Sequence, residues 1–111
     1  MSKSKQKGTA AETAVVNWLL SKGRKHVERR SLNGVNDRGD IAGVPGVVLE
    51  IKNCAKMELS AWLKELEVEM INDKADTGVV IHKKKGTQDV GLWYATMPVQ
   101  VWYKLIEEAG Y

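Results

Sequence analysis

With 111 residues, the chain is long enough for one domain with a hydrophobic core and too short for two. At 43% hydrophobic and 28% charged residues, its composition is that of a soluble globular protein. No apolar run approaches the roughly 20 residues of a membrane helix, and the lysine-rich start does not resemble a secretory signal. The single cysteine cannot form an internal disulfide. These features argue against a membrane protein and predict a cytoplasmic one, while the net charge of +3 is too small to identify a partner.

Residues 1–7 are polar and rich in lysine, which predicts a flexible basic tail ahead of a single domain over residues 8–111. A helix is expected next. Thr9 suits its N-cap, Glu12 would complete a capping box, and Gly23 suits the C-terminal cap. On this pattern alone, Glu12 is a capping acid.

Residues 25–31 alternate weakly between polar and apolar side chains, which predicts a strand at the edge of a sheet. Residues 31–37 are rich in Asn and Gly and are typical of a loop. A loop between a basic strand and the acidic segment that follows is well placed to contact a substrate.

Residues 38–52 predict two short strands joined at Val-Pro-Gly, a sequence that suits a type II turn. Strand residues i and i+2 share a face, so Glu50 and Lys52 lie together, opposite an apolar face. Charged groups on central strands are costly unless they are paired, solvated or bound to metal. We interpret Asp40, Glu50 and Lys52 as a divalent-metal site for phosphodiester hydrolysis. The alternative is a surface ion pair between Glu50 and Lys52.

This interpretation carries a geometric condition. A strict two-residue turn would pair Asp40 with Ile51, and because cross-strand partners share a face, Asp40 would then point away from Glu50. A metal site needs both acids on one face. We therefore predict an odd-length loop or a bulge between Asp40 and Val47, with Gly43 as a suitable place for it.

The second half predicts a helix over residues 60–75, strands over 77–82 and 91–97, and a last helix that begins at Pro98. The buried stripe of the last helix is expected to be Val99, Trp102, Ile106 and Ala109. In the 60–75 helix the expected stripe is Leu59, Leu63, Leu66 and Met70. Its acids, among them Glu65 and Glu69, fit a solvated face better than a place near the metal.

Charge is unevenly distributed along the chain. Residues 1–39 hold nine Lys and Arg against three Asp and Glu, a net +6, whereas residues 56–76 hold three against six, a net −3. The basic front half favours a polyanionic partner such as nucleic acid, although soluble proteins also scatter Lys and Arg freely. The lysines of residues 83–85 either contact phosphates or solubilise a strand end.

Three motifs resemble a known family. Gly39-Asp40 followed by Glu50-Ile51-Lys52 resembles the PD-(D/E)xK nuclease motif, with Gly39 in place of the proline. The sequence Lys7-Gly8-Thr9-Ala10-Ala11-Glu12 is similar to the opening of the archaeal-type Holliday junction resolvases, which also occur in phages, and so is Arg30-Ser31 before the loop. The resemblance covers residues 7–54 by motif and the rest only by the order of elements.

The resemblance implies an α/β chain with the single-domain PD-(D/E)xK nuclease fold, a mixed central sheet of about five strands flanked by helices. It implies a homodimer that cuts branched DNA, at four-way junctions, in DNA recombination and repair, in the host cytoplasm if a phage encodes it. The cofactor would be Mg²⁺, with Mn²⁺ as a substitute. By position, Asp40 and Glu50 would bind the metal with the Ile51 carbonyl, Lys52 would be the catalytic lysine, and Glu12 an additional acid at the metal or its water. Candidate DNA contacts are Lys7, Arg29, Arg30, Ser31, Asn33, Arg38, Lys83, Lys84 and Lys85.

Two alternatives stay open. One is another PD-(D/E)xK endonuclease, of the restriction or repair type, that acts on ordinary duplex or ends. The other is a non-catalytic DNA-binding module with a vestigial site. The retention of Asp40, Glu50 and Lys52 together argues against the second alternative.

Overall fold

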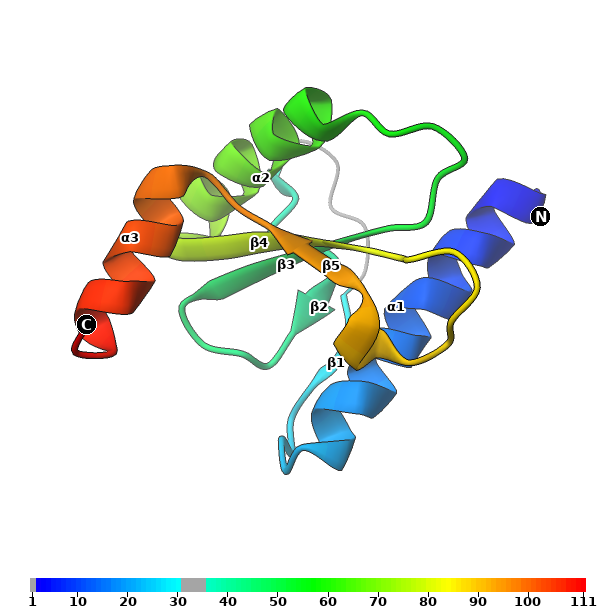
Figure 1. The fold of residues 1–111 in the computed structure, drawn as a ribbon, viewed down its shortest axis with the longest axis horizontal. Coiled ribbons are helices and arrows are strands. Elements are labelled where there is room, and N and C mark those ends of the chain that lie inside the picture. The colour runs from blue at the N-terminus through cyan, green and yellow to red at the C-terminus, as the bar shows by residue number, and fades with distance from the viewer. Residues whose placement is uncertain (1, 31–35) are drawn as a thin grey trace.

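The computed structural model describes residues 2–30 and 36–111, which form three α-helices around a five-stranded sheet (Figure 1). In chain order the elements are α1 (Lys3–Ser21), β1 (Glu28–Arg29), β2 (Ile41–Ala42), β3 (Val47–Lys52), α2 (Leu59–Asp73), β4 (Thr77–His82), the short 3₁₀ turn η2 (Val90–Leu92), β5 (Tyr94–Thr96) and α3 (Val99–Glu108). Apart from η2, this is the order that the sequence predicts. None of the described helices is long and apolar enough to cross a membrane.

The strands form one mixed sheet in the order β1-β2-β3-β4-β5. The β3 and β4 strands run parallel, and the other three neighbouring pairs run antiparallel. A parallel pair needs a crossover connection, which α2 provides between β3 and β4. The predicted α/β class with a mixed sheet of about five strands is confirmed, and β1 lies at the sheet edge as expected.

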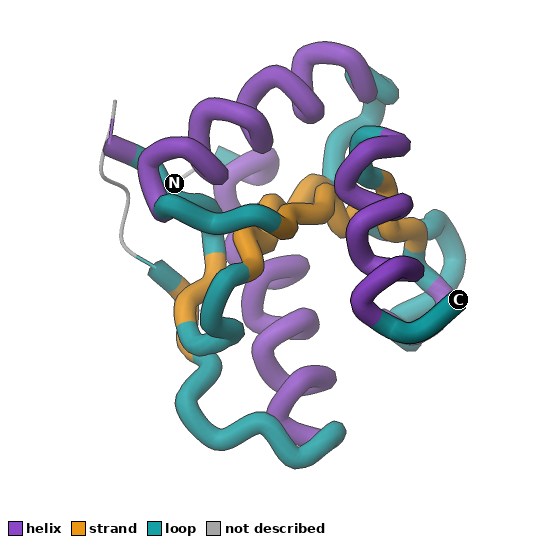
Figure 2. The backbone as a smooth tube through the Cα atoms, turned by 90° about the vertical axis from the view of Figure 1, so that its left-hand side faces the viewer, coloured by secondary structure: helices purple, strands orange, loops and turns teal. Residues whose placement is uncertain are grey.

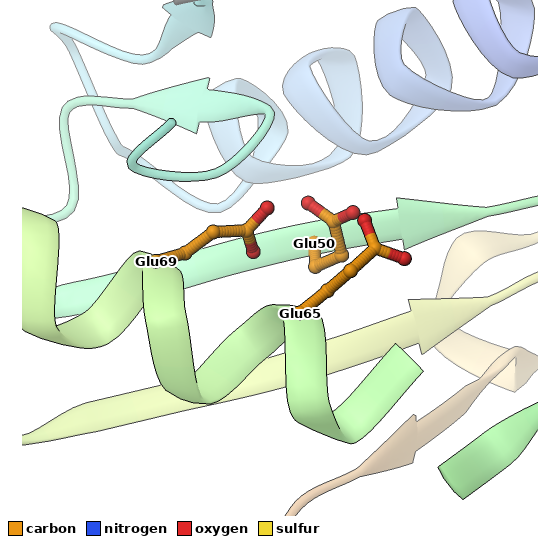
Figure 3. Close-up of side chains that lie close together, drawn as sticks. All are labelled: Glu50, Glu65 and Glu69. Carbon is orange, nitrogen blue, oxygen red and sulfur yellow. The ribbon is translucent and has the colours of Figure 1, made fainter. Parts of the chain in front are cut away.

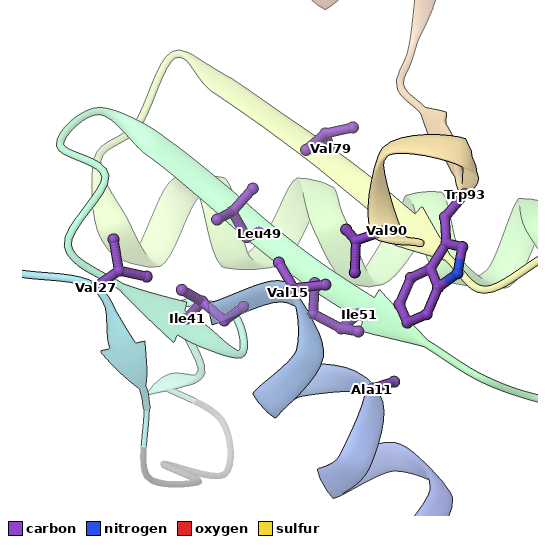
Figure 4. Packing of buried hydrophobic residues seen from close by; sticks show 9 residues of the cluster. All are labelled: Ala11, Val15, Val27, Ile41, Leu49, Ile51, Val79, Val90 and Trp93. Atoms are coloured by element: carbon purple, nitrogen blue, oxygen red, sulfur yellow. The ribbon is translucent and has the colours of Figure 1, made fainter. Parts of the chain in front are cut away.

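Helices cover both faces of this sheet (Figure 2). On one face, α1 and η2 pack against Leu49 and its neighbours (Figure 4). On the other face, Leu66 of α2 packs against Val48 of β3. Successive strand residues point to opposite faces, so Glu50 and Lys52 follow Val48 onto the α2 side. The face of β3 that carries Glu50 and Lys52 is therefore partly covered by α2.

The first helix begins earlier than predicted, because the segment expected to be a flexible tail is helical from Lys3 onwards. The hydroxyl of Ser2 caps it by accepting a hydrogen bond from the amide of Lys5 at 3.1 Å. Lys and Gln are good helix formers, so a capped lysine-rich segment extends the helix. Thr9 and Glu12 consequently lie inside α1, and the capping box predicted for them is wrong.

The hairpin between β2 and β3 has the turn that its sequence predicts. The amide of Val47 donates to the carbonyl of Val44 at 3.2 Å. In strict register this turn would place Ala42 opposite Leu49, but Ile41 lies opposite Leu49 instead. One extra residue is therefore accommodated between Ile41 and the turn.

Gly43 accommodates this extra residue. Its φ of +103° is a conformation that glycine adopts readily, and a Cβ at this position would collide with the carbonyl of His26. The resulting register brings Asp40 opposite Glu50. The predicted irregularity between Asp40 and Val47 is thus confirmed, and so is its place.

The last helix differs from the prediction in the face it buries. Val99 and Trp102, expected in the core, are 75% and 50% exposed, and Val101 is buried in their place. Because α3 leaves the edge of the sheet after β5 and extends away from it (Figure 1), only part of its surface has anything to pack against. Its apolar outer face is left exposed.

Candidate active site

Asp40 is fixed between the two strands of the hairpin by backbone hydrogen bonds. Its amide donates to the carbonyl of Leu49 at 2.8 Å, and its Oδ2 accepts from the amide of Ile51 at 2.7 Å. The hairpin register brings Asp40 opposite Glu50. Burial raises the pKa of Glu50, and the charge of Asp40 raises it further. The pair predicted as metal ligands is therefore brought together, with the Ile51 backbone beside it.

Lys52 lies two residues beyond Glu50 on the same face of β3. Its Nζ is 3.3 Å from Oε2 of Glu50 and 3.0 Å from Oε1 of Glu65 on α2. Burial alone would lower the pKa of Lys52, but the hydrogen bond that it donates to Glu65 and the charges of both acids outweigh it and raise that pKa. Lys52 is therefore a fixed positive charge at neutral pH.

Glu69 is a member of the site that the sequence pattern missed. One oxygen from each of Glu50, Glu65 and Glu69 lies within 4.8 Å of the others (Figure 3). Glu69 is only 2% exposed, so the solvated position predicted for it is wrong, whereas Glu65 is exposed as expected. The available signal was the spacing of Trp62, Leu66 and Glu69, four residues and then three apart, which places all three on one buried side of α2.

Burial dominates the electrostatics of these acids. It raises the pKa of Asp40 to about 6, with a further increase from the charge of Glu12 and a decrease from the hydrogen bond of Ile51. It raises the pKa of Glu69 to about 8 and that of Glu50 further still, where Asp40 and Glu69 add their repulsion. Desolvated carboxylates held close together favour a bound proton or a bound cation.

Glu12 reaches this site from α1. Its Oε1 accepts a hydrogen bond from Nε of Arg29 at 2.9 Å, and its charge raises the pKa of Asp40. The structure therefore places the predicted additional acid beside Asp40. Arg29, which stays a predicted DNA contact, makes an ion pair with this acid.

The backbone leading to Asp40 is attached to the end of α2. Nδ2 of Asn72 donates to the carbonyl of Asp37 at 2.8 Å, and Arg38 lies 3.6 Å from Asp73. Between them and Asp40, Gly39 has a φ of +99°, and a Cβ there would lie 2.8 Å from Val48. Proline is restricted to a φ near −65°, so the glycine that replaces the motif's proline is required by this path of the chain.

Apart from Arg29 and Arg38, whose ion pairs are described above, the predicted DNA-contact residues fall into three groups. Lys7 of α1 and residues 83–85 after β4 line one cavity of about 670 Å³ together with Asn53, the residue after Lys52. Nε of Arg30 is buried and has no hydrogen-bond partner among the described residues. Ser31 and Asn33 lie outside the described residues. Lysines far apart in the sequence thus gather at the end of β3 that carries the catalytic candidates.

Comparisons with protein-family models, with curated proteins and with solved structures give no match. The suitability of the site for a divalent cation consequently rests on its own chemistry. Mg²⁺ prefers oxygen ligands such as these carboxylates. Oε1 of Glu50 and Oε1 of Glu69 are buried without a hydrogen-bond partner in the described part of the chain, which is the state that a bound cation would relieve. The donor set fits the metal.

Proposed function

We propose that this protein is a DNA endonuclease that resolves four-way junctions by metal-dependent phosphodiester hydrolysis. The observation that carries the proposal is the hairpin register, which brings Asp40 opposite Glu50 while Lys52 shares the face of Glu50. The three residues of the motif thus form one constellation, as hydrolysis of a phosphodiester would require. The preference for branched DNA comes from the resemblance of residues 7–54, by motif, to junction resolvases.

Asp40 and Glu50 would hold Mg²⁺, or Mn²⁺ in its place, with the Ile51 carbonyl, and Glu12 would act on the metal or its water. The bound ion would polarise the phosphoryl oxygen and lower the pKa of the attacking water. Lys52 is held in its charged form by two acids, so it can stabilise the negative charge that develops on the phosphate. Arg29 holds Glu12 towards the site from the side of β1.

The substrate would approach along the lysine-lined cavity at the end of β3 and β4. Lys7 and residues 83–85 place positive charge there, next to the end of β3. Such contacts to phosphates supply affinity without sequence preference, and the affinity falls steeply with salt. This surface supports DNA as the substrate more directly than the overall charge does.

The proposal includes a homodimer, because paired cuts in a symmetric junction need two active sites and two-fold symmetry is the commonest arrangement. The residues that best suit contact with a second copy are exposed apolar side chains of α2 and α3, namely Val68, Ile71, Val99, Trp102 and Tyr103. Ile71 also lines a groove of about 440 Å³ to which both helices contribute. Exposed apolar patches of this kind are typical of interfaces. Light scattering after size exclusion tests the dimer: Trp102→Glu should convert it into a folded monomer.

The deciding experiment compares cleavage of a four-way junction with cleavage of its matching linear duplex at one salt concentration. We expect Mg²⁺-dependent cuts in the junction and much slower cleavage of the duplex. Equal rates would exclude junction specificity and favour the restriction- or repair-type endonuclease. Junction binding without any cleavage in Mg²⁺ or Mn²⁺ would favour the DNA-binding module.

A further inference from the structure

Glu69 is buried on α2 and aimed at β3, and the groups beside it, Glu50 and Asp37, are acids as well. Figure 3 shows Glu69 and Glu65 extending from α2 towards Glu50. Glu50 and Glu69 are 3% and 2% exposed, and Oε1 of each has no hydrogen-bond partner in the described part of the chain. Carboxylates are rarely buried in this way unless they hold a proton, a paired charge or a metal. This arrangement therefore requires an explanation beyond packing.

Lys52 does not provide the missing partner. Its Nζ contacts the other oxygen of Glu50, Oε2, and Oε1 of Glu65. Its one positive charge contacts two of the three carboxylates, and Oε1 of Glu50 and Oε1 of Glu69 stay without a hydrogen-bond partner in the described part of the chain. Glu12 does not enter this space, because it pairs with Arg29 on the side of α1 and β1.

We propose that Glu50 and Glu69 bind a second divalent cation on the α2 side of the site, with Glu65 as a third ligand at its exposed rim. This inference rests on the proposed function in one respect: Glu50 would bind both the second cation and the cation proposed above, which it holds with Asp40. Carboxylate oxygens that all lie within 4.8 Å of one another are close enough to share one ion, and oxygen ligands suit Mg²⁺ and Mn²⁺. Two neighbouring cations can stabilise both the attacking and the leaving oxygen of a phosphodiester. The site would then draw its acids from the hairpin and from α2.

The test counts Mn²⁺ bound to the whole protein without DNA, by calorimetry and by electron paramagnetic resonance of the free ion. We expect two Mn²⁺ per chain. Glu69→Gln keeps the size and shape of the side chain. It should leave one tightly bound Mn²⁺ and reduce the affinity for the second Mn²⁺ by at least about tenfold. Asp40→Asn should also leave one, namely the ion at Glu50 and Glu69. The control is Glu67→Gln, an exposed acid on the same helix, which should keep both.

One ion in the wild type, or two in Glu69→Gln, would overturn the second site. Glu65→Gln provides an independent check, since Glu65 is exposed and its loss should weaken the second ion without disturbing the fold. Both counts are made without cleavage. A protein that binds two ions but cuts no junction would refute the proposed function and leave this inference standing. A protein that cuts junctions but binds only one ion would refute this inference and leave the proposed function standing.

Discussion

The two faces of β3 differ in chemistry although they belong to the same six residues. On the α1 face, Leu49 and Ile51 pack into a cluster that is entirely apolar (Figure 4). On the α2 face, Val48 packs against Leu66, and one step along the strand Glu50 meets Glu69. One face is a continuous core, and the other changes from core to acid cluster along its length.

The α1 face of β3 stabilises the fold, whereas the α2 face carries acids that are proposed to bind metal. Burial of apolar side chains on the α1 face stabilises the fold at about 25 cal/mol per Å². The buried acids on the α2 face oppose folding, because desolvation and mutual repulsion disfavour their ionised forms. Functional sites typically contain groups that lower stability, next to a core that supplies it.

The largest predicted effect contrasts Leu49 on the α1 face with Asp40, which lies opposite Glu50. Leu49→Ala should lower the free energy of unfolding by about 2–5 kcal/mol, because it leaves a cavity in the α1-side core. Asp40→Asn should reduce junction cleavage by about 10³-fold, or about 4 kcal/mol of barrier, without lowering stability in the absence of metal. Urea unfolding and single-turnover cleavage measure the two. Unchanged Mg²⁺-dependent cleavage by Asp40→Asn would remove it from the site.

Lys52→Ala should reduce cleavage by about 10²- to 10³-fold while junction binding is retained. The reason is that Lys52 stabilises developing charge and faces acids, not the lysine-lined cavity. Gel-shift titration without Mg²⁺ and single-turnover cleavage with Mg²⁺ distinguish the two effects. Lost binding would reassign Lys52 to the grip on DNA.

Much of the hairpin could be predicted from the sequence because its geometry depends on neighbours. The turn, the alternation of β3 and the need for an irregularity at Gly43 all follow from residues within the segment. The position of Glu69 does not, because each helix residue is rotated by about 100° from the next and tertiary packing sets the final orientation. A buried stripe through Met70 and one through Glu69 differ by one residue, and packing of Trp62 favours the second.

The start of α1 and the outer face of α3 could not be predicted for the same reason. Ser2 was a cap as suitable as Thr9 by residue type, and only the observed hydrogen bond to Lys5 distinguishes them. Trp102 has the spacing of a core residue but is 50% exposed, because α3 extends away from the sheet (Figure 1). Exposure of a helix face depends on what lies opposite, which local spacing does not encode.

Stability without metal should decrease as pH rises from about 5 to about 8, an effect of at least about 1 kcal/mol. The pKa of Asp40 is raised to about 6 and that of Glu69 to about 8, whereas the unfolded chain releases these protons near pH 4. The stabilising contribution is therefore complete below the unfolded pKa values and is lost as pH rises through the folded ones. Urea unfolding in EDTA measures it.

Added Mg²⁺ should restore this stability, and most strongly at the upper end of the pH range, because the cation replaces the protons. Glu69→Gln should flatten the dependence on pH in EDTA, and Glu67→Gln should leave it unchanged. A wild-type stability that rises over this range without metal would contradict the electrostatics described for the α2 face.

The smallest predicted effect concerns the lysine-lined cavity, which lies beyond the two faces at the end of β3 and β4. Lys84→Ala and Lys85→Ala should each weaken junction binding and reduce the slope of log affinity against log salt by about 1. The reduction should be the same for junction and duplex, because phosphate contacts carry no sequence or shape information directly.

Lys104→Ala is the matched control, since Lys104 pairs with Asp76 away from this cavity. Unchanged salt slopes would mean that the lysines only solubilise the end of β4. Unequal losses on junction and duplex would instead make this cavity the part of the molecule that distinguishes branched DNA.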